Sequence, residues 1–304
     1  MRTPELSGII AATVLPQTDD HEIDFDAYPD YLEWLLEQGV SGLAVNVDTG
    51  EGPHLSPAEA LSVVEAAATH AAGCVPIVAG LGPGSTVSRV ETARDLKAAG
   101  ADALLVFPPS AFRGEPLPTG LPVDYYARIG EGADIPLVLF QLQDALGGVE
   151  YPIETLVAVS SLPHVVAIKE ATFSREKFTA TVSALANVDV TVLTGNDNFI
   201  HDSFVLGAEG ALIGFGTLAA GEQVEMVEAW FAGDRERAAE LGERIQKLAD
   251  VVFARPIRNY RARLKEALTM TGVIPSAAIR PPLARIPEAE RESLRRALRE
   301  FGLL

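Results

Sequence analysis

One lysine stands at the end of an apolar run, where a charged side chain is unusual. Lys169 follows His164–Ile168 and precedes Glu170. The other lysines lie in polar helical patterns, where we expect solvated side chains: Lys97, Lys177, Lys247 and Lys265. Burial disfavours an ammonium ion and would lower the pKa of Lys169 from about 10.4 toward ~7. The neutral amine would then attack a carbonyl carbon and form a Schiff base. The structural alternative is a Lys169–Glu170 ion pair at a strand end.

A second polar group follows another strand-like run. Val45–Val47 leads into Asp48, Thr49, Gly50 and Glu51. On a tight turn, the Thr49 hydroxyl and the backbone N–H groups would form a cradle for a carboxylate. The alternative is a turn that only reverses the chain, with Asp48 accepting hydrogen bonds from its own backbone amides.

Bringing these groups together requires a regular set of elements. The candidate strands are Gly8–Val14, Leu43–Asp48, Val75–Ala79, Ala103–Phe107, Pro136–Phe140, His164–Lys169, Val188–Thr194 and Ala211–Phe215. Helical patterns between them include Asp24–Gln38, Ser56–Ala72, Ser85–Ala99 and Ser174–Ala186. Continuously apolar strands are covered on both faces, as in a parallel sheet. The alternation predicts a (β/α)8 TIM barrel rather than an open sheet, since no G-x-G-x-x-G follows the first strand.

After residue 220 the pattern becomes helical. The expected helices are Gly221–Phe231, Arg235–Phe253, Ile257–Thr271 and Glu288–Phe301. We therefore predict a barrel over 1–220 and a C-terminal helical region over 221–304. Active sites of such barrels lie at the carboxyl ends of the strands, so Lys169 and Thr49 should meet at one mouth.

Composition and charge restrict the classes of partner that this protein can have. The 304 residues include 24 Lys and Arg against 42 Asp and Glu, a formal net charge of -18. Such an excess repels phosphate backbones and anionic lipids, so we expect neither a nucleic-acid nor a membrane partner. The single Cys74 excludes an intrachain disulfide, and the five histidines lack the spacing of a metal site. A free thiol, and the absence of an apolar signal core in Met1–Glu5, predict a cytoplasmic protein.

In these motifs the sequence resembles the dihydrodipicolinate synthase / N-acetylneuraminate lyase family of class I aldolases. The resemblance spans nearly the whole chain and is carried by Gly8–Thr13, Asp48–Glu51, Ile168–Thr172, Gly195–Asp197, Gly272–Pro275 and Arg280–Leu283.

The resemblance implies a Schiff-base lyase without metal or cofactor. Lys169 would attack the keto carbon of pyruvate or another 2-oxo acid, and Thr49 with the Gly50 backbone would hold the carboxylate. Gly214, at the end of strand eight, would line the pocket. The iminium would act as an electron sink, so that an enamine adds to an aldehyde, or a C–C or C–O bond breaks. A homo-oligomer, dimer or tetramer, is also implied.

The sequence departs from the family pattern at its proton relay. The position of the family's strand-five tyrosine is Phe140, which has no hydroxyl. Asp48 replaces the first hydroxyl residue of the strand-two turn, and we predict that it acts as the acid or base. Gln141 is expected to orient a water or the substrate beside Phe140. Tyr125 or Tyr126 is an alternative source of the missing hydroxyl.

A second departure concerns the aldehyde substrate. The family's synthase branch holds that substrate's carboxylate with an arginine, but here no arginine lies between Arg128 and Arg175. We therefore predict a lyase, either an aldolase or a dehydratase, that acts on a 2-oxo acid through Lys169. The alternatives are authentic dihydrodipicolinate synthase and, from another class, a non-catalytic 2-oxo-acid-binding barrel.

Overall fold

Eight parallel strands close into a barrel in chain order, as the computed structural model shows. It describes residues 4–304; Met1–Thr3, on which part of the signal-peptide expectation rests, lie outside. The strands are β1 (Gly8–Ala12), β2 (Gly42–Val45), β3 (Ile77–Leu81), β4 (Ala103–Val106), β5 (Leu137–Leu142), β6 (Val165–Ala171), β7 (Thr191–Thr194) and β8 (Gly210–Ile213). The predicted (β/α)8 barrel is confirmed.

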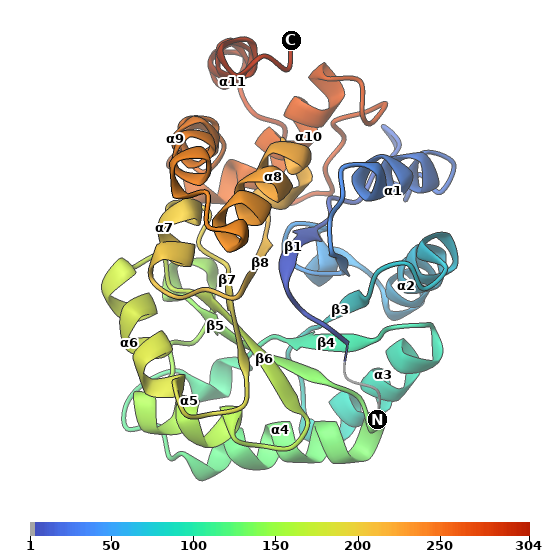
Figure 1. Ribbon diagram of the computed structural model, residues 1–304. Coiled ribbons are helices and arrows are strands. Elements are labelled where there is room, and N and C mark those ends of the chain that lie inside the picture. Colours follow the sequence, from blue (N-terminus) through green and yellow to red (C-terminus); the bar gives the residue numbers. More distant parts are fainter. Residues whose placement is uncertain (1–3) are drawn as a thin grey trace.

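A helix follows each strand, and these helices surround the barrel (Figure 1). They are α1 (Ala27–Glu37), α2 (Pro57–Ala71), α3 (Thr86–Ala98), α4 (Gly120–Ala133), α5 (Ile153–Ser160), α6 (Arg175–Leu185), α7 (Ile200–Val205) and α8 (Ala220–Ala232). Serine side chains cap three of them. Ser56 forms a reciprocal capping box with Glu59, and Ser85 and Ser174 each accept from a first-turn N–H.

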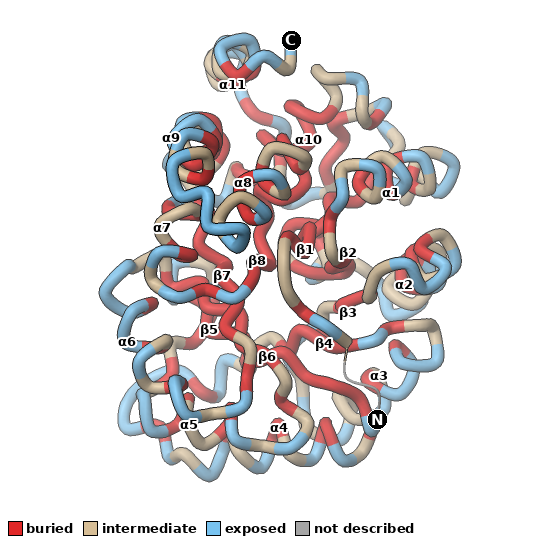
Figure 2. The backbone as a smooth tube through the Cα atoms, viewed as in Figure 1, coloured by how far each residue is buried: buried red, intermediate tan, exposed pale blue. Residues whose placement is uncertain are grey.

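The strand side chains are shared between two apolar cores. One core fills the barrel interior, and the larger one lies between the strands and the surrounding helices. Both cover the strands, which are buried along almost their whole length (Figure 2). Because side chains alternate along a strand, Phe140 and Leu142 point inward on β5, as do Ala167 and Ala171 on β6. Lys169 lies midway between the last two and shares their face.

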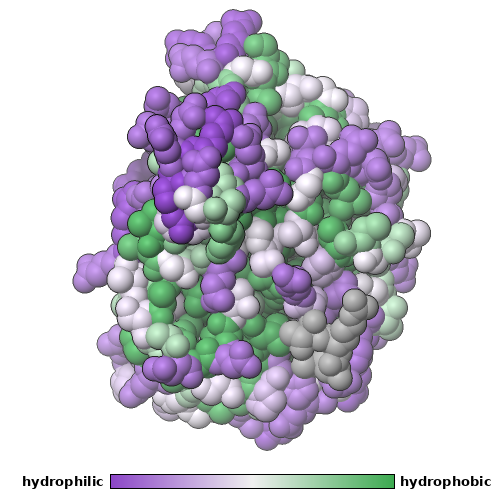
Figure 3. Space-filling view, in the orientation of Figure 1, coloured by the Kyte–Doolittle hydropathy of each residue, from purple (hydrophilic) through white to green (hydrophobic). Residues whose placement is uncertain are grey.

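Further helices follow the barrel and gather at one end of the molecule (Figure 1). They are α9 (Arg235–Val252), α10 (Tyr260–Met270) and α11 (Glu288–Phe301). The outer surface of α9 and α11 is mostly hydrophilic (Figure 3). The predicted boundary after residue 220 falls at the start of α8, which packs on β1; the division into two domains stays a prediction. Within residues 4–304, no helix is long and apolar enough to cross a membrane.

A buried ion pair ties the C-terminal helices to the barrel. The Lys265 ammonium on α10 contacts Glu51 in the turn after β2, and both side chains are fully buried. Lys265 also donates to the Ala278 carbonyl at 2.8 Å, and the Arg280 N–H donates to the other Glu51 oxygen at 2.9 Å. The expectation of a solvated Lys265 is therefore wrong, because a polar helical pattern does not reveal a partner more than two hundred residues away.

Candidate active site

A narrow cavity at the carboxyl ends of the strands holds Lys169. Strand ends, the turns after them and the C-terminal region all contribute side chains. The lining residues are Asp48, Thr49, Phe140, Leu142, Leu146, Lys169, Ala171, Phe173, Gly195, Asp197, Gly214, Phe253, Ile257 and Tyr260. The fold thus brings Lys169 and Thr49 to one mouth, from β6 and from the turn after β2. These strands stand across the barrel from each other.

Lys169 is held in an apolar setting between neighbouring strands. It pairs in register with Phe140 on β5, and its ammonium lies 4.7 Å from the centre of the Phe140 ring. The residue is 8% exposed, and this desolvation lowers the Lys169 pKa from 10.5 to about 8, although Asp197 and Asp48 oppose the shift. A Cβ at Gly195 would lie 2.8 Å from the Lys169 Cε, so glycine leaves the room that the lysine occupies.

Glu170 does not pair with Lys169. It is the next residue on β6, so its side chain lies on the other face of the strand. There its carboxylate accepts a hydrogen bond of 2.7 Å from the Asn196 amide. The alternative interpretation of Lys169, an ion pair with Glu170 at the strand end, is therefore wrong.

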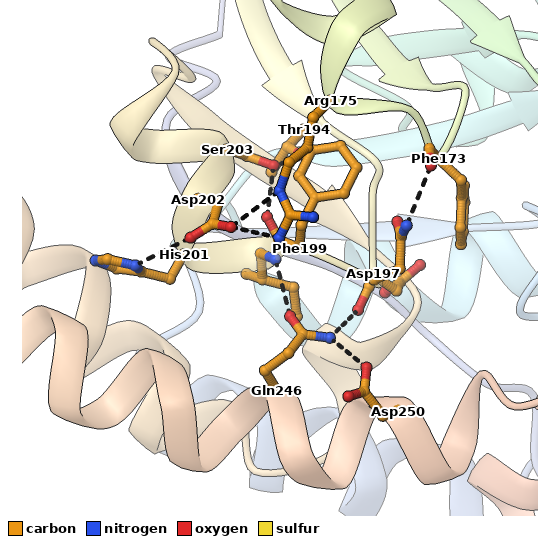
Figure 4. A network of polar contacts seen from close by, with 12 residues as sticks. Phe173, Arg175, Thr194, Asp197, Phe199, His201, Asp202, Ser203, Gln246 and Asp250 are labelled. Carbon is orange, nitrogen blue, oxygen red and sulfur yellow. Dashed lines mark hydrogen bonds and ion pairs between the residues drawn. The ribbon is translucent and has the colours of Figure 1, made fainter.

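Asp197 is a second buried titratable group beside the lysine. It follows β7 and is 5% exposed; one carboxylate oxygen accepts from the Phe215 N–H at 2.8 Å. Burial raises the Asp197 pKa from 3.8 to about 7, against the lowering effects of that N–H and of Lys169. Its carbonyl accepts from Gln246 on α9, which also donates to Asp250, so the turn is braced from outside (Figure 4). Sequence reasoning noted Asp197 only as part of a turn and gave it no role.

The strand-two turn is closed by its own backbone, with the Glu51 N–H donating to the Asp48 carbonyl at 3.2 Å, and it is also joined to α10. Asp48 forms an ion pair with Arg261, and its Oδ2 accepts a hydrogen bond of 2.8 Å from the Tyr260 hydroxyl. Arg261 also donates from Nε to the Asp48 carbonyl at 2.6 Å. Asp48 is therefore not the isolated, buried carboxyl that we expected of an acid or base. Its side chain also does not cap its own turn, which was the alternative.

Thr49 and Gly50 occupy different places in this turn. Thr49 lines the cavity, and a Cβ at Gly214 would lie 3.0 Å from its hydroxyl. Gly50 lies behind the cavity wall, where a Cβ would come within 2.9 Å of the Thr13 carbonyl oxygen. The backbone N–H groups of Thr49 and Gly50 donate to no backbone acceptor within residues 4–304.

Tyr260 is the cavity hydroxyl that sequence reasoning missed. It starts α10 and stacks on Phe253, with ring centres 5.0 Å apart. Burial raises the Tyr260 pKa well above its usual value, so the hydroxyl keeps its proton. The alternatives Tyr125 and Tyr126 are buried in α4, where Tyr126 donates to the Val106 carbonyl, and neither lines the cavity. In one sequence, a tyrosine at a helix start carries no signal that it will reach a distant barrel.

Gln141 lies outside the cavity. Its neighbours Phe140 and Leu142 point into the barrel, so the Gln141 side chain points outward toward the helices. There its oxygen accepts from the Tyr151 N–H at 3.0 Å, and its amide donates to Thr181 at 3.4 Å. The expectation that Gln141 orients a water or the substrate is corrected by this strand alternation, whereas Phe140 does line the cavity.

Sequence comparison relates this chain to one protein family. The model of the dihydrodipicolinate synthetase family matches residues 5–301. The 4-hydroxy-tetrahydrodipicolinate synthase of Maridesulfovibrio salexigens is 31% identical over 98% of this chain and 99% of its own length. The corresponding enzyme of Gluconacetobacter diazotrophicus is 28% identical over 100% of both chains.

Solved structures of similar proteins share the fold over nearly their whole length. Dihydrodipicolinate synthase from Thermotoga maritima has a TM-score of 0.90 at 28% identity, covering 98% of this chain and 99% of that one. The Acinetobacter baumannii enzyme, solved in complex with pyruvate, has a TM-score of 0.87 at 29% identity and the same coverage.

Proposed function

The chain belongs to the dihydrodipicolinate synthetase family, and from this premise we propose that Lys169 forms a Schiff base with pyruvate or another 2-oxo acid. The chain is a lyase of the class I aldolase type. One observation carries the assignment to Lys169. It is a buried lysine with a pKa lowered to about 8, in a cavity shared with Asp197 and Thr49. Pyruvate is bound by the Acinetobacter baumannii relative, which supports it as the first substrate to test.

Lys169 and Asp197 divide the proton transfers. The neutral Lys169 amine adds to the keto carbon, and Asp197 accepts the proton that the amine loses. Asp197 then returns a proton to the departing hydroxyl, so that water leaves and an iminium remains. C3 then loses a proton to Tyr260, which restores the phenol and gives the enamine. The enamine attacks an aldehyde; the reverse sequence cleaves the C–C bond.

The strand-two turn is the proposed carboxylate site. The Thr49 hydroxyl faces the cavity, and the N–H groups of Thr49 and Gly50 have no backbone acceptor in the described chain. Arg261 offsets the charge of Asp48, which allows a second carboxylate to approach Thr49.

Tyr260 is proposed to supply the hydroxyl that Phe140 lacks. Its proton is directed toward Asp48, so Asp48 orients the phenol and accepts its hydrogen bond. This changes the role proposed for Asp48: it acts through Tyr260 rather than by itself. A phenol with a raised pKa keeps its proton at rest, and on binding of the 2-oxo acid this proton turns from Asp48 to the oxygen of the reacting carbonyl.

The second substrate need not be that of the curated relatives. They are named synthases, yet among residues 4–304 no arginine lines this cavity. An arginine clamp recognises a carboxylate by two parallel hydrogen bonds, and its absence disfavours an acceptor that carries one. We therefore propose a lyase with another acceptor.

We also propose that the protein is cytoplasmic and forms a homotetramer. Light scattering would measure the mass of the oligomer.

Trapping the imine tests the proposal. Intact mass after borohydride reduction with pyruvate should reveal one reduced adduct on the wild-type protein and on Lys247→Ala, a surface lysine variant, but none on Lys169→Ala. Exchange of the pyruvate methyl protons into D2O, followed by NMR, should accompany it and would exclude a merely binding barrel. If neither pyruvate nor longer 2-oxo acids give an adduct, the proposal is wrong.

A further inference from the structure

We infer that the second substrate is an uncharged aldehyde with an apolar substituent, and that the product is a 4-hydroxy-2-oxo acid with an apolar tail. This inference rests on the proposed Schiff base at Lys169. It chooses between the aldolase and dehydratase chemistries left open above. It also replaces the charged aldehyde expected of a lysine-pathway synthase and the polyhydroxylated chain of a sugar acid.

One wall of the cavity beside Lys169 is apolar. Phe140 and Leu142 come from β5, Leu146 from the turn after it, and Phe173 from the segment after β6. All four belong to the apolar cluster of the barrel interior or pack against it. None of these side chains offers a hydrogen bond, so substrate hydroxyls placed there would lose their partners in water without replacement. An aliphatic or aromatic substituent would instead extend the existing core.

The opposite side of the cavity holds the polar groups that would meet the 2-oxo acid, beside the apolar Phe253 and Ile257. Asp48, Thr49 and Tyr260 cluster at the turn after β2, across the barrel from β6. This separation gives the two substrates different surroundings. The 2-oxo acid places its carboxylate at Thr49 and its keto carbon at Lys169, and the acceptor substituent lies toward Phe140 and Leu146.

No cation in the described chain is free to receive a second carboxylate in this cavity. Lys169 is consumed by the Schiff base, and Arg261 is paired with Asp48. Arg113, from the loop after β4, donates from Nε to the Gly148 carbonyl at 3.1 Å and does not line the cavity. The carboxyl of Asp197 does line it, whereas the charge of Asp48 is offset by Arg261. An acceptor with a carboxylate would therefore lie near the Asp197 carboxyl and find no counterion.

The reaction balances with the residues present and one water. The enamine C3 forms a bond to the aldehyde carbon, and the aldehyde oxygen takes the Tyr260 proton and becomes the 4-hydroxyl. Water then adds to the iminium carbon and returns a proton to Tyr260, which releases the 4-hydroxy-2-oxo acid and the neutral Lys169 amine. No oxidant, metal or cofactor enters the balance. Cleavage of the same product is the reverse sequence.

An aldehyde panel tests the inference on the full-length protein. Pyruvate is combined with butanal or benzaldehyde, and separately with glyoxylate, succinic semialdehyde or glyceraldehyde. Product formation is followed by liquid chromatography with mass detection. We expect kcat/KM for butanal or benzaldehyde to exceed that for each charged or hydroxylated aldehyde at least tenfold. Equal or better use of the charged or hydroxylated aldehydes would overturn the inference.

Failure of the inference is distinguishable from failure of the proposed function. If methyl-proton exchange and the borohydride adduct appear but no apolar aldehyde reacts, the Schiff base stands and the inference falls. If neither exchange nor adduct appears, both fall.

A charge added to the apolar wall gives a second test. Leu146 is half-buried on a short turn, which should accept an arginine without loss of the fold. Leu146→Arg should reduce kcat/KM for butanal and raise it for succinic semialdehyde, so that their ratio changes at least tenfold. Val87→Arg adds the same charge on α3, where Val87 is 73% exposed, and should leave the ratio unchanged. An unchanged ratio in a folded Leu146→Arg variant that still exchanges pyruvate protons would contradict the inference.

Discussion

The Tyr260 hydroxyl donates a hydrogen bond of 2.8 Å to Asp48 Oδ2, between residues 212 positions apart in the sequence. The bond joins the first residue of α10 to the turn after β2. It brings a phenol into a cavity whose strand-five position is occupied by Phe140. A hydroxyl thus reaches this site from the C-terminal helices.

Replacing Tyr260 tests the role of that phenol. Tyr260→Phe keeps the stacking on Phe253 but removes the proton donor, so kcat/KM should fall by about 100-fold, within the range of general acid–base catalysis. Steady-state turnover of pyruvate with an accepted aldehyde would measure it. Tyr125→Phe is the matched control, because the buried Tyr125 hydroxyl has no partner within residues 4–304. Equal activity in the two variants would remove Tyr260 from the mechanism.

The pH dependence of imine formation should report Lys169. Only the neutral amine attacks a carbonyl, and burial lowers the Lys169 pKa to about 8. The rate of borohydride-dependent inactivation by subsaturating pyruvate should therefore rise with pH and reach half its maximum near pH 8. A midpoint at the ordinary lysine value would mean that the side chain is solvated.

Asp197→Asn should separate turnover from lysine basicity. The Asp197 carboxylate raises the Lys169 pKa, so its removal should move the inactivation midpoint to a pH below about 8. Turnover should fall about 100-fold, because Asn accepts no proton. Asp202→Asn is the control. Asp202, on α7, is half-exposed and pairs with Arg175, so its replacement should change neither the midpoint nor the turnover. An upward shift of the midpoint would contradict the proposed arrangement.

Gly195→Ala should displace the lysine without touching its chemistry. The added methyl would lie 2.8 Å from both the Lys169 Cε and the Ala171 Cβ, and the flexible lysine side chain would move aside. We expect the borohydride adduct to form at least tenfold more slowly, since reacting atoms must be well oriented. Gly82→Ala introduces a methyl with nothing within 4 Å, and adduct formation there should proceed at the wild-type rate.

The buried Lys265–Glu51 pair should be costly to break. Lys265→Met leaves Glu51 charged and without its main partner in the protein interior, which should lower the free energy of unfolding by about 3–5 kcal/mol. Lys177→Met breaks an exposed ion pair with Glu150 and should cost at most about 1 kcal/mol. Urea denaturation followed by circular dichroism would compare them. Similar losses would show that the pair is not the anchor proposed for α10.

The sequence by itself determined the barrel and its lysine. Continuous apolar runs alternating with capped amphipathic helices leave few folds other than a (β/α)8 barrel, because each strand must be covered on both faces. A charged residue at the end of such a run, as at Lys169, must lie at the mouth of the barrel. These inferences depend on local sequence patterns and on one rule of topology, that barrel active sites lie at the carboxyl ends of the strands. The patterns can be recognised in short stretches of consecutive residues.

The tertiary structure alone decided which polar groups share the cavity with Lys169. Strand alternation turned Gln141 outward while its neighbour Phe140 faced the lysine. Tyr260 and Asp48 met only because α10 crosses the mouth, held there by Lys265 and Glu51. Burial, which shifts the pKa of Asp197 to about 7, is likewise a property of all surrounding elements at once. Such contacts join residues far apart in the chain, and no local pattern encodes them.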